Sequence, residues 1–302
     1  MLSALLAVVA AMANGLASVL QRKEARERPE SESLSWRLIW SLLHRPVWFG
    51  GIAALTAGFL LQATALSNGR ISVVESLMVL DLPVALVLSS VLLGGRLRAR
   101  EWWTAAAMAG GLAGLLLALS PSKGSDAGVP GAIWAAAVGA NLLLVAAGVS
   151  WARLLPEGAR KAAVLGATTS CGFGLTAALM AGATADASRS IGTVFTSWQL
   201  YAMVAVGTGS LFLMQSAVQA GSLLAAQPGL SLGDPVISIL WGTLVFKETV
   251  RGGLFIVAAV AAAAVVGAAV VVLARSPLLA DETDQSERTQ GTGEKVDEVE
   301  KS

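Results

Sequence analysis

Long apolar runs separated by short polar segments dominate the chain and predict its secondary structure. An α-helix needs about 20 mostly apolar residues to cross roughly 30 Å of hydrocarbon. Windows of this length recur along the chain, and we expect an all-α, polytopic membrane bundle of about nine transmembrane helices. The predicted spans are Leu2 to Leu20, Val47 to Ser67, Ile71 to Leu93, Trp102 to Ser120, Gly131 to Val149, Ala162 to Ala181, Trp198 to Gln219, Leu223 to Phe246 and Leu254 to Ala274.

The composition agrees with a membrane protein and argues against several other classes. The 302 residues are 55% hydrophobic and 14% charged, with a mean hydropathy of +0.69, whereas soluble domains carry about 25% charged residues. One cysteine, Cys171, and one histidine, His44, cannot build a disulfide framework or a Cys/His metal cluster. No phosphate-binding glycine loop and no paired nucleophile and histidine are present, so we expect neither an enzyme nor a cofactor.

Lysine and arginine residues are divided unevenly between the predicted loops. The loops after the first, third and fifth spans, with the residue after the last span, contain Arg22, Lys23, Arg26, Arg28, Arg37, Arg45, Arg96, Arg98, Arg100, Arg153, Arg160, Lys161 and Arg275. The other side has Arg70, Lys123, Arg189, Lys247 and Arg251. Because basic loops stay in the cytoplasm, we expect a multi-pass plasma-membrane protein with its N-terminus outside and its C-terminus inside.

Two segments are not expected to cross the membrane. Residues 34–46, LSWRLIWSLLHRP, are too short to span and carry tryptophan and arginine beside an apolar face, which is typical of a helix in the cytoplasmic membrane interface. Residues 275–302 are polar and acidic, and this composition predicts a disordered cytoplasmic tail.

Two parts of the chain become similar when one is shifted by 152 residues. Phe59 to Leu88 then aligns with Leu211 to Leu240, and Pro83 falls on Pro235. This similarity indicates a first repeat over 1–120, a linking span over 121–161 and a second repeat over 162–274. Since the linking span crosses the membrane once, the repeats are inverted, an arrangement that places substrate sites near the bilayer midplane between them.

Three acidic residues lie inside predicted spans without a basic residue at their depth: Glu75, Asp81 and Asp234. A carboxylate near the bilayer centre costs about 2.5 to 3.5 kcal/mol, and such residues usually mark a pathway through the protein. We expect Asp81 and Asp234 to face each other across the symmetry axis, with Glu75 about 9 Å further along the third helix by helical rise. A proton or a bound cation must then neutralise them.

Nearby prolines and amides can complete a cation site. A proline removes a helical hydrogen-bond donor, so Pro83 and Pro235 free carbonyl oxygens. Further side-chain oxygens are available from Gln62, Gln215, Gln227, Asn14 and Asn141. Oxygen ligands suit hard cations such as Mg²⁺, which makes Asp81 and Asp234 candidate metal ligands. A structural alternative stays open, in which the carboxyl groups are protonated and, like the amides, form interhelical hydrogen bonds.

Three short motifs stand out: ALSNGRIS at Ala65 to Ser72, with Pro83 in the same span, LLGGRLRAREWW at Leu92 to Trp103, and GDPVISILWGTLVFKETV at Gly233 to Val250. They resemble the drug/metabolite transporter (EamA-like) superfamily, and Lys247 and Glu248 resemble that family's end-of-helix Lys-Glu element. In the first copy, Gly95 stands where a glutamate is usual. The basic first loop and the segment Arg45 to Leu66 are most similar to the branch of NIPA-type magnesium transporters. The resemblance implies secondary transport of a cation such as Mg²⁺.

Two other functions remain compatible with the sequence. One is a proton-coupled exporter of a small metabolite, amino acid or drug, and the other is a membrane subunit or sensor that transports nothing. The expected partners are the transported solute and the lipid bilayer, and no nucleic acid. A small-xxx-small pattern, GGLAG at Gly110 to Gly114, is compatible with a homodimer or with close packing inside the bundle.

Overall fold

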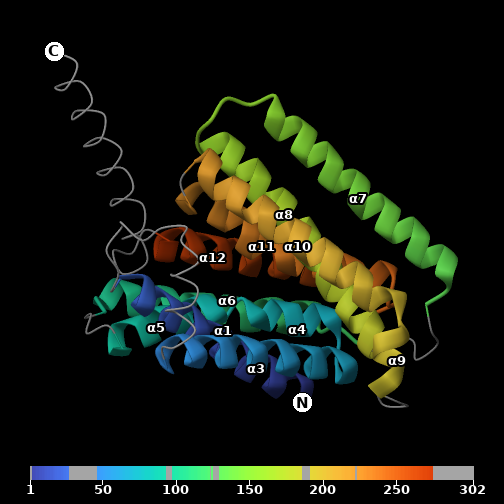
Figure 1. Ribbon diagram of the computed structural model, residues 1–302, viewed down its shortest axis with the longest axis horizontal. Coiled ribbons are helices and arrows are strands. Elements are labelled where there is room, and N and C mark those ends of the chain that lie inside the picture. Colours follow the sequence, from blue (N-terminus) through green and yellow to red (C-terminus); the bar gives the residue numbers. More distant parts are fainter. Residues whose placement is uncertain are drawn as a thin grey trace.

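The computed structural model describes residues 2–26, 46–92, 97–122, 124, 129–185, 191–221 and 223–274, and every regular element in these ranges is a helix. The helices are α1 (Leu2–Arg26), α3 (Pro46–Asn68), α4 (Ile71–Met78), α5 (Asp81–Leu92), α6 (Ala99–Leu119), α7 (Gly131–Arg153), α8 (Ala159–Thr184), α9 (Ile191–Thr196), α10 (Trp198–Ala220), α11 (Leu223–Leu244) and α12 (Leu254–Ala274). Figure 1 shows their arrangement. The predicted interfacial segment 34–46, apart from the first residue of α3, and the predicted tail 275–302 lie outside the described residues.

Eight segments within the described ranges are long and apolar enough to cross a membrane. They comprise α1, α3, α4 together with α5, α6, α7, α8, α10 and α12. The remaining predicted span, Leu223 to Phe246, corresponds to α11, which contains Gln227, Asp234 and two prolines and is not one of these eight. The prediction of an all-α, polytopic membrane bundle is therefore confirmed.

The third predicted span is interrupted, whereas the sequence pattern predicted one continuous helix. Its halves, α4 and α5, are separated by a turn at Val79 and Leu80. Pro83 has no N–H to donate to the carbonyl of Val79, and the amide of Leu82 donates to that carbonyl instead, at 3.4 Å. The 9 Å spacing expected between Glu75 and Asp81 assumed a continuous helix, and the structure removes that assumption.

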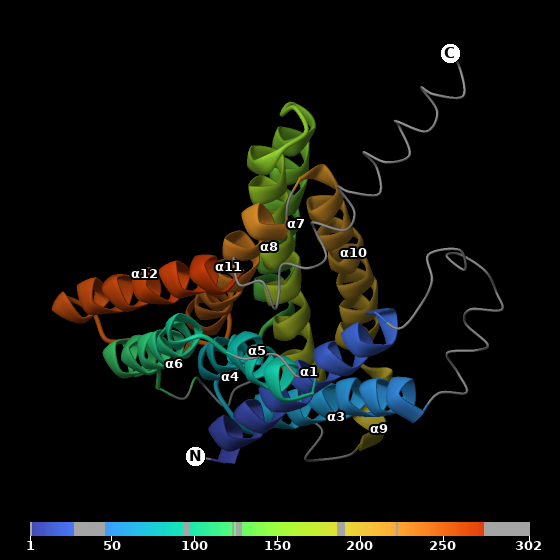
Figure 2. The same cartoon turned by 90° about the vertical axis from the view of Figure 1, so that its left-hand side faces the viewer.

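Helices pair in the same way within the two halves of the chain. α1 packs along α3, just as α8 packs along α10, and α1 contacts α4 and α5 as α8 contacts α11. Between the halves, α6 packs on α12 and α4 on α11 (Figures 1 and 2). This matched pairing is the pattern that a duplication produces. The repeat boundaries drawn from the sequence stay a prediction.

Helix α7, which covers most of the predicted linking segment, packs on α8 at the edge of the second half (Figure 1). Trp134 attaches one end of this helix to the bundle. It is buried, and its ring centroid lies 5.6 Å from that of Trp198, 5.8 Å from that of Trp241 and 5.9 Å from that of Phe246. These aromatic side chains therefore serve to pack the linking helix onto the second half.

The glycines of the GGLAG pattern lie partly at the contact between α6 and α12. A Cβ atom added to Gly111 would lie 2.8 Å from the side chain of Val266, and one added to Gly114 would lie 3.6 Å from Ala262. These two glycines thus allow close packing inside the bundle. The homodimer stays a prediction.

Glycines also set the approach of α8 to α11. A Cβ atom on Gly166 would lie 2.5 Å from the backbone oxygen of Ala226, and one on Gly229 would lie 2.7 Å from the backbone nitrogen of Ala167. Because both obstacles are backbone atoms, neither can move aside without shifting a helix.

We therefore expect Gly166→Ala to separate α8 from α11 and to destabilise the fold by about 1 to 3 kcal/mol, the usual cost of overpacking. The measurement is the melting temperature of the purified protein in detergent, followed by size-exclusion chromatography after heating. Gly139→Ala on α7 is the matched control, because nothing lies within 4 Å of its added Cβ. Equal melting temperatures for the two variants would contradict the close approach.

Candidate functional site

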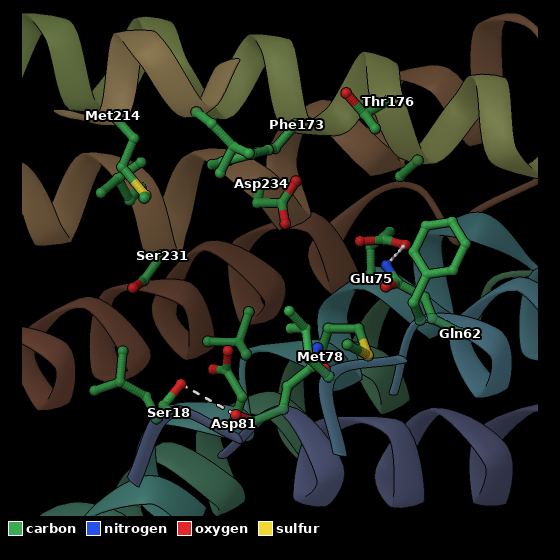
Figure 3. A pocket seen from close by; sticks show the side chains of 18 of the residues that line it. Ser18, Gln62, Glu75, Met78, Asp81, Phe173, Thr176, Met214, Ser231 and Asp234 are labelled. Atoms are coloured by element: carbon green, nitrogen blue, oxygen red, sulfur yellow. Dashed lines mark hydrogen bonds between the residues drawn. The ribbon is translucent and has the colours of Figure 1, made fainter. Parts of the chain in front are cut away.

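A cavity of about 780 Å³ lies between the two halves of the bundle. Its lining residues come from α1, α3, α4, α5, α8, α10 and α11 and from the turn between α4 and α5 (Figure 3). Of the polar residues that the sequence singled out, Asn141 is buried but does not line this cavity, whereas seven others do: Asn14, Gln62, Glu75, Asp81, Gln215, Gln227 and Asp234. The fold thus gathers residues from distant parts of the chain around a single space.

Three carboxylates reach the cavity from three helices. Glu75 on α4 is buried and accepts a hydrogen bond of 2.9 Å from the side-chain nitrogen of Gln62. Asp81 is the first residue of α5, where the helix dipole favours a negative charge. Asp234 on α11 has a buried Oδ1 atom without a hydrogen-bond partner, and it is repelled by both other carboxylates. Figure 3 shows the three groups at separate positions around the space.

None of the described residues that line the cavity is lysine, arginine or histidine. A buried carboxylate without a positive partner is unfavourable, because burial removes the water that stabilises its charge. The described lining thus supplies no side chain of positive charge to balance an ionised carboxylate.

The amide side chains contribute polar atoms at several points of the lining. Gln227 donates from Nε2 to the hydroxyl of Ser231 at 3.3 Å. Asn14 has a buried Oδ1 atom without a hydrogen-bond partner, and its side chain lies against Gly58 of α3, where an added Cβ atom would collide with it. Together with Gln62, which donates to Glu75, these residues add neutral donors and acceptors to the lining that contains the carboxylates.

Each of two prolines removes one helical backbone hydrogen bond beside the cavity. Pro83 removes the usual helical donor to the carbonyl of Val79, and Pro235 removes the donor to the carbonyl of Ser231. Both Val79 and Ser231 line the cavity. Of the two carbonyl groups that the sequence analysis expected to be freed, that of Val79 accepts from the amide of Leu82 at 3.4 Å, and both belong to residues that line the cavity.

Positions related by the shift of 152 residues line the cavity from both halves. These pairs are Phe59 with Leu211, Gln62 with Met214, Glu75 with Gln227, Met78 with Leu230, Val79 with Ser231, and Leu82 with Asp234. The positions correspond, but the charges do not: Glu75 is matched by an amide, and Asp234 by a leucine. The two halves thus contribute equivalent surfaces with different chemistry.

Clusters of metal-binding side chains are not found among the described residues. Within those ranges, no three histidine, cysteine, aspartate or glutamate side chains come together to hold a metal ion. A metal at Asp81 and Asp234 would need amide, carbonyl or water oxygens to complete its coordination. The assignment of these two residues as metal ligands stays a prediction.

Hydrogen bonds join the two halves at one end of the bundle, which we call the Glu248 end. Glu248, which follows α11, is buried and accepts a hydrogen bond from the amide of Ile71 at 2.8 Å and another from the hydroxyl of Ser72. It thereby satisfies donors at the start of α4 that have no partner within the helix. Burial raises the pKa of the Glu248 carboxyl, while these two donors and Arg70 act in the opposite direction.

Three loops meet at the Glu248 end. The guanidinium of Arg70 donates to the carbonyl of Pro121, and the amide of Ser122 donates to the carbonyl of Thr249 at 2.8 Å. The amide of Arg251 also donates to the carbonyl of Leu119 at 2.8 Å. The charge distribution assigned these loops to one side of the membrane, and they do share one end of the bundle. That this end faces outward stays a prediction.

Apolar packing joins the two halves at more than one level of the bundle. Toward the Glu248 end, one buried cluster contains both Ile71 of the first half and Trp241 of the second half. Further from that end, another buried cluster contains both Leu86 of the first half and Leu273 of the second half. The hydrogen bonds between the halves, rather than the apolar packing, therefore distinguish the Glu248 end.

The fold and the cavity define a polytopic helical membrane protein with an acidic internal cavity. The chain is 29% identical over 259 residues to an uncharacterized protein of Corynebacterium glutamicum, an alignment that covers 82% of this chain and 87% of the relative. No family model and no solved structure matches the chain.

We expect Glu248→Ala to destabilise the protein by about 2 kcal/mol, because it leaves the buried Ile71 amide without a partner and deletes hydrogen bonds to a charged group. Glu157→Ala is the control, since this exposed residue pairs only with Lys161 on the surface and should change stability by about 0.5 kcal/mol or less. Melting temperatures in detergent measure both effects. A Glu248→Ala protein as stable as the control would show that these bonds do not hold the halves together.

Proposed function

We propose that this chain is a secondary transporter of the drug/metabolite superfamily type, which moves a cation through the acidic cavity by alternating access. One observation carries the proposal: three carboxylates line a cavity inside a membrane bundle, and no described lining residue is basic. Ionisable side chains inside a membrane commonly mark a transport pathway or proton relay. The sequence resemblance, with Mg²⁺ as its implied cation, supports the same class.

The charge of the cavity supports a positively charged cargo. Glu75 has only an amide partner, and one oxygen of Asp234 has none. An entering cation supplies the missing counter-charge and takes the place of the water that the carboxylates lost on burial. An anion would meet repulsion from all three groups.

The packing of the halves supports alternating access. Two halves with matched helix pairing can rock about a site that lies between them. The hydrogen bonds described between the halves lie at the Glu248 end, so this end acts as the closed gate of the state described here. In the alternate state, the bonds from Glu248 to Ile71 and Ser72 would break and contacts at the opposite end would form.

A second candidate is the proton-coupled exporter of a small metabolite. It is favoured by the number of carboxylates, because three acidic groups are more than a monovalent cargo requires. In this version at least one carboxylate carries the coupling proton, and the cargo occupies the remainder of the cavity.

Flux through proteoliposomes tests both candidates. Mg²⁺ uptake is followed with an internal indicator, and proton movement is followed with an internal dye while amino acids and organic cations are added outside, with protein-free liposomes as the baseline. We expect Asp81→Asn and Asp234→Asn to reduce the flux at least tenfold, because each removes one charge from the cavity.

Glu157→Gln provides the matched control, since it removes an exposed carboxylate that does not line the cavity. Solute flux lost in both cavity variants but retained in this control supports the proposal. Flux that is unchanged in all three variants would contradict the acidic-site mechanism. A wild-type protein that moves none of these solutes would favour a membrane subunit or sensor instead.

A further inference from the structure

The geometry of the cavity points to a more specific cargo: we propose that it binds an organic ammonium ion, a protonated amine attached to an apolar body. This inference rests on the proposed function and narrows its substrate class. It follows from three independent properties of the cavity, namely its size, the chemistry of its walls and the unpartnered oxygen of Asp234.

The volume of the cavity is larger than that of a hydrated metal ion. A water molecule occupies about 30 Å³ of liquid, so an octahedral Mg²⁺ ion with all its waters fills roughly 200 Å³. The cavity holds about 780 Å³. That volume falls in the range of roughly 300 to 1,000 Å³ that is usual for sites of drug-sized organic ligands.

The cavity lining contains several side chains that favour contact with the apolar part of an organic ligand. Phe59 and Phe173 supply aromatic rings, and Met78, Met180 and Met214 supply thioethers. Thioether side chains adapt to apolar ligands of irregular shape, and aromatic faces attract ammonium groups. A hard metal ion prefers oxygen ligands and gains little from any of these side chains.

The polar side chains of the cavity include an acceptor, the Oδ1 atom of Asp234, that suits a ligand with a hydrogen-bond donor. The Oδ1 atom of Asp234 is buried without a partner, and it lies beside Gly174, where an added Cβ would be 3.8 Å away. Phe173 is the preceding residue, and Figure 3 draws it on the same side of the cavity as Asp234 and Met214. An ammonium group that donates to Asp234 forms a charge-assisted bond and brings its apolar body toward these side chains.

Calorimetric titration of the full-length protein in detergent tests this assignment with three probes: 4-phenylbutylammonium, its uncharged counterpart 4-phenylbutan-1-ol, and Mg²⁺. We expect the wild type to bind the ammonium probe at least tenfold more tightly than the alcohol. Mg²⁺ should not displace the ammonium probe at equal concentration. Because this comparison uses only the wild type, it does not depend on the folding of any variant.

Variants locate the binding site. Asp234→Asn should weaken binding of the ammonium probe at least tenfold and leave binding of the alcohol within twofold. Phe173→Ala should weaken both organic probes about threefold or more, because they share the phenyl group. Glu157→Gln, the surface control, should match the wild type. Size-exclusion profiles identify any variant that is misfolded.

Two results would overturn the inference: equal affinity for the ammonium and the alcohol, or Mg²⁺ binding that Asp234→Asn abolishes in a protein that does not bind the ammonium. Flux measurements test the transporter proposal separately from these binding measurements. Mg²⁺ flux without ammonium binding would keep the transporter and reject the organic cargo. Ammonium binding without flux of any solute would keep the ligand class and reject transport.

Discussion

Burial of carboxylates without a positive partner is the constraint on which this account depends. An apolar bundle gains nothing by enclosing Glu75, Asp81 and Asp234 together, because each loses hydration and Asp234 is repelled by the other two. The fold eases this cost only in part, through an amide beside Glu75 and the helix start at Asp81. The remaining imbalance is the reason for our proposal that a cation enters the cavity.

The two halves build this cavity from corresponding positions, yet their chemistry differs. Val79 and Ser231 are equivalent in the shifted alignment, and each precedes a proline by four residues. Even so, the proline interrupts the helix in the first half and leaves α11 continuous in the second. Glu248 likewise joins the halves at one end, and the corresponding first-half positions, Gly95 and Arg96, carry no carboxylate. Corresponding positions of the two halves thus carry different charges and make different contacts.

Much of the candidate site could be predicted from the sequence, because charged and amide side chains are conspicuous inside apolar spans. Glu75, Asp81, Asp234 and their neighbouring amides stood out for this reason, and the structure places them together. The contribution of Phe173 or Met214 could not be predicted, since an apolar residue that lines a cavity has the same helical spacing as one that packs in the core.

Other features depended on contacts that sequence spacing does not reveal. Pro83 was recognised as a helix breaker, but whether its helix would kink or separate is decided by packing around Val79. The hydrogen bond from Ile71 to Glu248 joins residues 177 positions apart. Its only sequence signal was the resemblance of Lys247 and Glu248 to a family motif, and that resemblance gave no partner.

Access to the cavity from each side of the membrane is the measurement that tests the central claim most directly. Replacing Cys171 by serine removes the single cysteine, and Ser231→Cys then places one thiol in the cavity lining. Proteoliposomes are treated with a membrane-impermeant maleimide added outside, inside or on both sides. Alternating access predicts that the thiol is labelled from either side, at rates that a bound cation changes in opposite directions. Labelling from one side alone, whatever cation is present, would show that the cavity is a closed-ended pocket and would contradict the account.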